Sequence, residues 1–240
     1  MTNEELLAKI HQELDYDYQI GFHNIMKENY INQSRFNKQK YCMNSELVTE
    51  DEIVSSILSK GLYVPEPCFG LVSTVCFPKK VTAESFDYIY VNRCNKNYVI
   101  VVIIPNYIYI DDKKYFLGDM QDVRNLANFA LFYELLPKEF IYGYYTRNVY
   151  KKDNSKDKYY FEPQIQFYSN ENFYGYMSKE EQTQFWLDYF NKNHINISVL
   201  KAVNYPNLFN TIFQNKRNRY AIKWTKETIK KKNKVYTKTK

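Results

Sequence analysis

The chain has 240 residues and a mass of 29.0 kDa, which predicts one large domain, or one domain with an appendage. Hydrophobic residues make up 45% of it, enough for a core and too many for a wholly disordered chain. With 3 His and 4 Cys, it has too few ligands, too widely scattered, for a zinc finger or a disulfide framework. Neither GxxxxGK[ST] nor GxGxxG occurs, which excludes a glycine-rich phosphate loop.

No apolar run approaches the length of about 18 residues that a membrane span needs. The first residues are acidic and lack the apolar core of a signal peptide. Both observations predict a soluble protein that resides in the cytoplasm.

Charge is distributed unevenly along the chain. Residues 216–240 hold 11 Lys and Arg and one acid, a net charge of +10, whereas the rest of the chain has a net charge of −4. The basic residues that we expect to neutralise phosphates are Lys216, Arg217, Arg219, Lys230, Lys231 and Lys232. Tyr220 and Trp224 lie among them and could stack on bases. A solvated C-terminus and attachment to a membrane surface remain alternatives.

Three helices are predicted from one signal, a Ser or Thr followed three residues later by Glu in a capping box. These helices span residues 2–14, 49–60 and 178–193. Gly61 supplies the stop of the second helix. A fourth helix, 119–136, is predicted from apolar residues at positions 123, 126, 129, 130, 133 and 136, and it ends before Pro137.

Strands are predicted between these helices from short apolar or alternating runs. They span residues 18–25, 69–77, 98–110, 139–146 and 159–168, and the third of them is broken at Pro105. Residues 26–48 are predicted to be an insertion or loop, and 151–158 a hairpin loop. The pattern indicates an α+β protein, with a single domain over 1–215 and a basic tail over 216–240.

Few side chains carry an obvious chemistry. The four cysteines form no CxxC pair, so buried, inert thiols are expected, and no metal site is predicted. His23 ends an aromatic strand just before a polar loop. We expect it to face a pocket, although this feature alone also fits a histidine of the core.

His23 belongs to a series of short motifs that follow one another along the chain in a definite order. They are Phe22-His23, Ile57-Leu58-Ser59-Lys60-Gly61-Leu62, Phe69-Gly70, Ser85-Phe86-Asp87-Tyr88, and Glu139 at the opening of an aromatic strand. This order resembles the ADP-ribosyltransferase fold in its poly(ADP-ribose) polymerase-like and bacterial toxin-like branch, over about residues 18–168. The resemblance implies a split antiparallel sheet flanked by helices, with a helical C-terminal extension, and NAD as the substrate.

The resemblance also implies roles for individual residues. His23 would hydrogen-bond the adenosine-side ribose of NAD, and Tyr88 would stack on the nicotinamide. Ser73 and Thr74 fall in the cofactor-binding segment, where the branch often has an aromatic residue. Asn24 and Ile25 stand where the family has small residues.

The resemblance further implies a catalytic glutamate. Glu139 would contact the nicotinamide ribose and stabilise the cationic transition state that forms as nicotinamide leaves. Glu134 is a rival for this role. Glu139 is preferred because the family has its catalytic Glu at the start of a strand, whereas Glu134 lies within the predicted helix 119–136.

Two classes of function follow. The first is an NAD-dependent ADP-ribosyltransferase-like enzyme, such as a toxin or defence factor that modifies protein or nucleic acid. The second is a non-enzymatic protein that holds nucleic acid or a protein partner with its basic tail and Tyr-rich surface.

Overall fold

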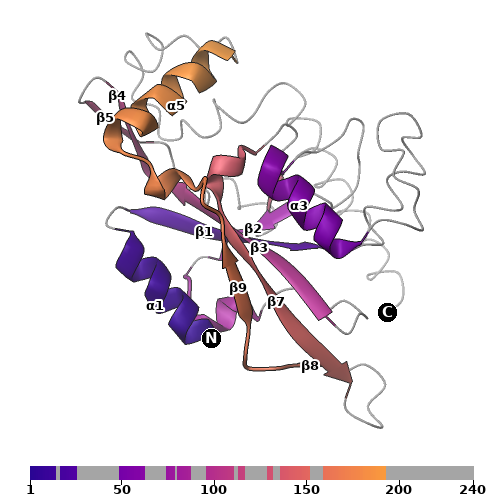
Figure 1. Cartoon of the computed structure of the whole chain (residues 1–240). Coiled ribbons are helices and arrows are strands. Elements are labelled where there is room, and N and C mark those ends of the chain that lie inside the picture. Colours follow the sequence, from indigo (N-terminus) through magenta and orange to yellow (C-terminus); the bar gives the residue numbers. More distant parts are fainter. Residues whose placement is uncertain are drawn as a thin grey trace, which may run out of the picture.

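The structure is a computed structural model, which describes residues 1–14, 17–25, 49–62, 74–78, 80–87, 96–110, 113–116, 129–131, 136–151 and 159–192. Within these ranges the chain is α+β, with an antiparallel sheet between helices (Figure 1). This confirms the predicted class. The predictions for 26–48 and for the C-terminal tail lie outside the described residues. Of the predicted hairpin loop 151–158, Lys151 belongs instead to a strand, and the rest lies outside the described residues.

Among the described residues, seven strands form the main sheet. They are β1 (Tyr18–Ile25), β2 (Thr74–Cys76), β3 (Lys96–Pro105), β6 (Phe129–Leu131), β7 (Ile141–Lys151), β8 (Tyr159–Phe161) and β9 (Gln166–Ser169). Their order is β6-β2-β1-β3-β7-β8, and β9 pairs with the first half of β7. Every neighbouring pair is antiparallel. β4 (Tyr107–Ile110) and β5 (Lys113–Phe116) form a separate two-stranded sheet.

The helices begin where the capping boxes predict. They are α1 (Asn3–Glu13), α3 (Glu50–Lys60) and α5 (Lys179–Lys192), preceded by Thr2, Thr49 and Ser178. Gly61 follows α3 with a φ of 88°, a left-handed value that favours glycine. Three short 3₁₀ turns complete the described elements: η2 (Ala83–Phe86), η3 (Lys138–Phe140) and η4 (Tyr174–Tyr176). No helix of the described ranges is long and apolar enough to cross a membrane.

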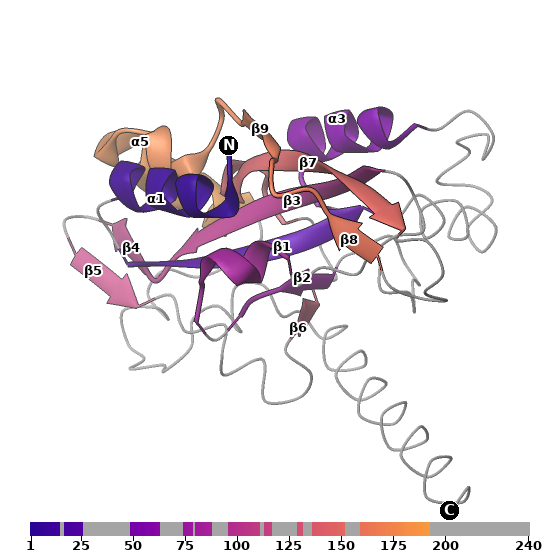
Figure 2. The ribbon, with the colours of Figure 1, turned by 90° about the horizontal axis from the view of Figure 1, so that it is seen from below.

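The two sides of the sheet carry two separate cores, because successive side chains of a strand point to opposite faces. On β3, Val99, Val101 and Ile103 face α1, and this side is called the α1 face. Ile100, Val102 and Ile104 face α3 and α5, which defines the α3–α5 face. Figure 1 shows the sheet lying between α1 on one side and α3 and α5 on the other, and Figure 2 shows the succession of strands from β7 through β3, β1 and β2 to β6.

One predicted helix is wrong where the structure describes it. Residues 129–131 belong to the predicted helix 119–136, yet they form β6 and pair with β2. Leu136, further along the same segment, pairs with Leu62 in an isolated bridge. An apolar run such as 129–133 also fits a buried strand, and pairing with a neighbouring strand decides between the two.

Three strand predictions are confirmed only in part. The predicted strand 69–77 is described as a strand over Thr74–Cys76, and 159–168 contains two strands, β8 and β9. The strand predicted over 139–146 begins at Ile141, so Glu139 lies in η3 instead of opening the strand. β3 ends at Pro105 as expected, since proline has no N–H for a ladder.

Candidate functional site

His23 lies in the interior of the sheet. Its strand, β1, is flanked by β2 and β3, and His23 pairs with Ile100. Directly paired residues share a face, so His23 points to the α3–α5 face, where α3 packs against the sheet. Its exposed fraction is 2%. His23 is therefore a buried residue of the sheet, on the side against which α3 packs, and does not lie exposed at a strand end.

Three strands meet beside His23. Cys76 of β2 pairs with Phe22, and the antiparallel register then places Thr74 beside Asn24, next to His23. Thr74 also pairs with Leu131 of β6, and Glu134 follows Leu131 by three residues. Glu134 itself, Ser73 and Tyr88 lie outside the described residues.

Glu139 is placed elsewhere. Its turn, η3, leads into β7 at Ile141, which pairs with Val102, and Val102 pairs with Gly21. Ile141 is thus two residue levels from His23 along the sheet and two strands across. At about 3.3 Å per residue and about 4.8 Å per strand, this separation is about 12 Å, and Glu139 lies in the turn that precedes Ile141. The structure does not bring Glu139 and His23 together.

The reasons for preferring Glu139 over Glu134 no longer hold. The helix before Glu134 is replaced at 129–131 by β6, and Glu139 does not open a strand. Glu139 is half-buried, beside the end of α3, because η3 packs against that helix. Glu134 follows β6, and β6 pairs with β2, the strand that lies beside the His23 end of β1. Of the two glutamates, Glu134 is therefore the one that follows a strand near His23.

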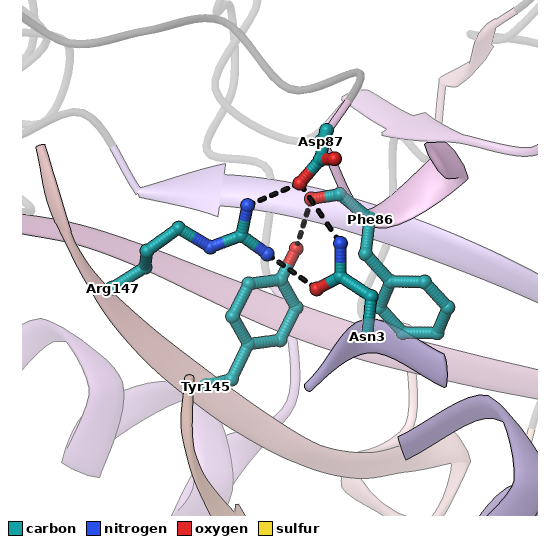
Figure 3. A network of polar contacts seen from close by, with 5 residues as sticks. All are labelled: Asn3, Phe86, Asp87, Tyr145 and Arg147. Atoms are coloured by element: carbon teal, nitrogen blue, oxygen red, sulfur yellow. Dashed lines mark hydrogen bonds and ion pairs between the residues drawn. The ribbon is translucent and has the colours of Figure 1, made fainter. Parts of the chain in front are cut away.

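A buried polar network joins three segments that are far apart in the sequence (Figure 3). The Arg147 guanidinium of β7 contacts the Asp87 carboxylate through Nη1 and donates through Nη2 to the Asn3 side-chain oxygen. Asn3 donates to Asp87 over 2.9 Å, and the Tyr145 hydroxyl donates to the Phe86 carbonyl over 2.8 Å. Arg147 is 4% exposed, and its Nε has no hydrogen-bond partner. The network holds the start of α1 and the end of η2 against β7.

Sequence reasoning missed this network. In the sequence, Asp87 belongs to the Ser85–Tyr88 motif and Asn3 to the predicted helix 2–14, and neither position indicates a contact with residue 147. One signal was available: Arg147 is a lone cation in the aromatic run of 140–150. A charged residue in a strand that is otherwise buried needs a partner of opposite charge.

A second cluster gathers tyrosines around a carboxylate at the other end of α1. Glu13 accepts hydrogen bonds from the hydroxyls of Tyr142 (2.7 Å) and Tyr176 (2.9 Å) and pairs with Lys9. Burial alone would raise the pKa of Glu13, but the hydrogen bonds from Lys9 and the two tyrosines outweigh it and lower this pKa. Burial and the same carboxylate raise the pKa of Tyr176 to about 12, so the phenol stays a donor at neutral pH.

Tyrosines also cluster at the start of α3. Burial, followed by the nearby Asp51 carboxylate, raises the pKa of Tyr98 to about 12. Tyr144 of β7 stacks on Tyr168 of β9 with ring centroids 4.6 Å apart. Burial raises the pKa of Tyr144, and so do Tyr168 and Asp51. Because their pKa values are raised, the phenols of Tyr98 and Tyr144 stay protonated at neutral pH, so they can donate hydrogen bonds but supply no base.

Metal chemistry has no described donor set: across the described ranges, no group of three or more His, Cys, Asp or Glu side chains could hold a metal ion. The basic residues of the tail, from Lys216 onward, lie outside these ranges. Comparison of the chain with protein-family models, with curated proteins and with solved structures finds no match.

Proposed function

We propose that this chain binds single-stranded nucleic acid through its basic segment 216–240. The observation that supports this proposal is the separation of charge along the chain. The segment has a net charge of +10 within 25 residues, whereas the remainder has a net charge of −4. A polyanion is therefore attracted to the segment and weakly repelled by the rest of the protein.

The residue types in the segment suit a single strand. Lysine and arginine neutralise phosphates and release the counterions condensed on them. Tyr220 and Trp224 stand among the basic residues, and aromatic rings stack on unpaired bases without regard to sequence. We expect binding that is strongly salt-dependent and indifferent to base sequence.

The experiment compares the full chain with a variant that lacks 216–240, using a fluorescent single-stranded oligonucleotide between about 50 and about 200 mM salt. The full chain should bind and lose affinity steeply with salt, and the truncated chain should not bind. Circular dichroism of both proteins is the control for folding, and the truncated chain should keep the spectrum of the full chain. Equal affinity of both proteins across the salt series would refute the proposal.

Two substitutions separate charge from stacking. Replacing Lys230, Lys231 and Lys232 by Gln should weaken binding and reduce the salt slope, with Glu227→Gln as the matched control that should strengthen it slightly. Trp224→Ala should weaken binding by about 1–3 kcal/mol at an unchanged salt slope. A reduced salt slope in Trp224→Ala would argue against stacking.

A second candidate is an NAD-dependent ADP-ribosyltransferase-like enzyme, which would act as a toxin or defence factor on protein or nucleic acid. The order of β1, β2 and β6 supports it, because it places Thr74 beside Asn24 and places the strand that precedes Glu134 beside Thr74. His23, which is buried, would then be a structural residue of the sheet and not a contact of NAD. In such an enzyme the bond between the nicotinamide nitrogen and the ribose breaks. Nicotinamide leaves with the electron pair, and an acceptor oxygen or nitrogen takes the ADP-ribose and loses its proton.

Glu134 is the glutamate that we assign to this reaction, in place of Glu139. A carboxylate beside the ribose would stabilise positive charge that exists only in the transition state. Release of nicotinamide from NAD is measured for the wild type, Glu134→Gln and Glu139→Gln. The Glu134 variant should lose about 10²- to 10³-fold in rate while the Glu139 variant stays close to wild type. A wild type without NAD turnover, with lysate and nucleic acid supplied as acceptors, would exclude the enzyme.

A further inference from the structure

The strand β9 forms an outer edge of the main sheet. It pairs with β7 on one side, and within the described residues no strand pairs with its other side. Gln166, Tyr168 and Ser169 are exposed, and Phe167 is half-buried. Exposed edges are usually protected by charged residues, proline or a bulge, and the sequence Gln-Phe-Tyr-Ser has none of these.

The direction of the backbone groups on β9 follows from its pairing. The Asn170 amide donates to the Tyr142 carbonyl, across the register that pairs Tyr144 with Tyr168. In an antiparallel ladder the backbone groups of alternate residues point to the same side. Those of Gln166 and Tyr168 therefore point to β7, and those of Phe167 and Ser169 point outward.

One extended residue already lies along this outward row. Ile165, just before β9, exchanges both backbone hydrogen bonds with Met1, at 2.8 and 3.0 Å. The outward groups of Phe167 and Ser169 continue the same row, and no backbone partner is described for them. The row is thus a partly used template for strand addition.

The chain around β9, residues 162–172, contains two glutamates and no lysine or arginine. Glu162 and Glu171 are exposed and flank β9. On the α3–α5 face, Asp51 is close enough to Tyr144, the stacking partner of Tyr168, to raise the pKa of Tyr144. Two described residues with cationic groups contact this part of the chain: the Met1 ammonium donates to the Ile165 carbonyl, and the Lys138 carbonyl accepts a bond from the Asn170 side chain.

We propose that an extended, basic peptide segment of a protein partner adds as a strand to the outward edge of β9. Its backbone pairs with Phe167 and Ser169, and its lysine or arginine side chains lie near Glu162 and Glu171. Tyr168 offers an exposed ring to one face of the added strand. This interaction is separate from nucleic-acid binding, because it uses the acidic sheet edge and not the basic tail.

The test uses the full chain and a fluorescent, capped peptide of alternating Lys and Thr, with its binding followed by anisotropy at low salt. Two further peptides carry N-methyl groups on either the odd or the even residues, which removes one row of backbone donors in each. Strand addition uses a single row, so one N-methylated peptide should bind like the parent and the other should not bind. A peptide with Glu in place of Lys should not bind.

Protein variants complete the test. Replacing Glu162 and Glu171 together by Gln should weaken binding about three- to tenfold, as expected for two exposed charges. Glu180→Gln on α5 is the matched control and should change nothing. Deletion of 216–240 should leave peptide binding intact, which separates this proposal from the proposed function. No binding, equal loss with both N-methylated peptides, or equal binding of the Glu peptide would each overturn the proposal.

Discussion

Helices α1 and α5 pack on opposite faces of one sheet by different means. α5 buries Trp186 and Phe190 completely, and Trp186 Nε1 donates to the Tyr174 hydroxyl over 2.9 Å. The side chains of Gln182 and Thr183 add hydrogen bonds to backbone carbonyls, so the polar contacts of α5 join neutral groups. α1 also buries apolar side chains, but a polar cluster fixes each of its ends: Arg147 with Asp87 near the start and Glu13 with its tyrosines near the end. Packing of rings is indifferent to pH, whereas the polar clusters depend on which groups are charged. The two helices should therefore respond differently to mutation and to acid.

The largest effect is expected on the α5 side. Trp186 contacts the rings of Phe140, Tyr174 and Phe190 and is fully buried. Trp186→Ala removes these contacts and leaves a cavity, so the free energy of unfolding should fall by about 3–5 kcal/mol in denaturant titrations. Glu180→Ala, at an exposed position of the same helix, is the control and should stay within about 0.5 kcal/mol. A loss below about 1.5 kcal/mol in Trp186→Ala would show that α5 contributes little to the fold.

The next effect is expected at the network that holds α1. Asp87→Asn keeps the shape of the side chain but removes the charge opposite the buried Arg147 guanidinium. Loss of one partner from a buried ion pair costs about 3–5 kcal/mol. Because the Asp87 side chain is 46% exposed, water screens part of this, and we expect a loss of about 2 kcal/mol.

A double variant identifies the cause of that loss. Arg147→Met removes the buried cation, so adding it to Asp87→Asn should recover part of the stability. Hydrogen exchange of the α1 amides should rise in Asp87→Asn and fall again in the double variant. If the double variant is less stable than Asp87→Asn, the buried charge is not the source of the loss.

The contrast between the helices also shows what the sequence could reveal. Capping boxes are local, so the starts of α1, α3 and α5 could be predicted from two residues each. The Arg147 network joins residues 3, 87 and 147, and no local pattern encodes such a contact. The strand β6 was missed because Phe129, Ala130 and Leu131 satisfy a helical period as well as a buried strand, and only the pairing with β2 decides between them.

The candidate site shows the same difference between local signals, which the sequence reveals, and contacts between distant segments, which it does not. The position of His23 in a strand was predictable, but its burial depends on β2, β3 and α3 together. The distance between Glu139 and His23 depends on the register of three strands. A hydrophobic pattern predicts which face of the sheet a residue points to, but it does not predict which residue of the next strand lies beside it. Only the order of the motifs along the chain suggested that His23 and Glu139 share a site, and the register of the strands places them apart.

Smaller effects are expected at the two helix starts. Thr2 caps α1 and Ser178 caps α5 with the same pair of hydrogen bonds to a Glu three residues on. Thr2→Ala and Ser178→Ala should each cost about 1 kcal/mol. The Thr2 cap adjoins Asn3 of the network, so its loss should be non-additive with Asp87→Asn, whereas Ser178→Ala and Asp87→Asn should add. Additivity in both pairs would show that the cap and the network act independently.

The smallest effect should appear as a function of pH at the end of α1. The pKa of Glu13 is lowered from its ordinary value of 4.5 because the hydrogen bonds from Lys9, Tyr142 and Tyr176 outweigh burial. The unfolded chain then binds this proton more readily than the folded one, so the contribution of Glu13 is present above about pH 4.5 and is lost as pH falls through the lower, folded value. The difference in free energy of unfolding between wild type and Glu13→Gln should therefore shrink below pH 4.5, from a maximum of no more than about 1 kcal/mol. Other carboxylates titrate in both proteins and cancel in this difference. The corresponding difference for Trp186→Ala should stay constant over the same range, and a matching decline there would mean that the two helices are not attached by different means.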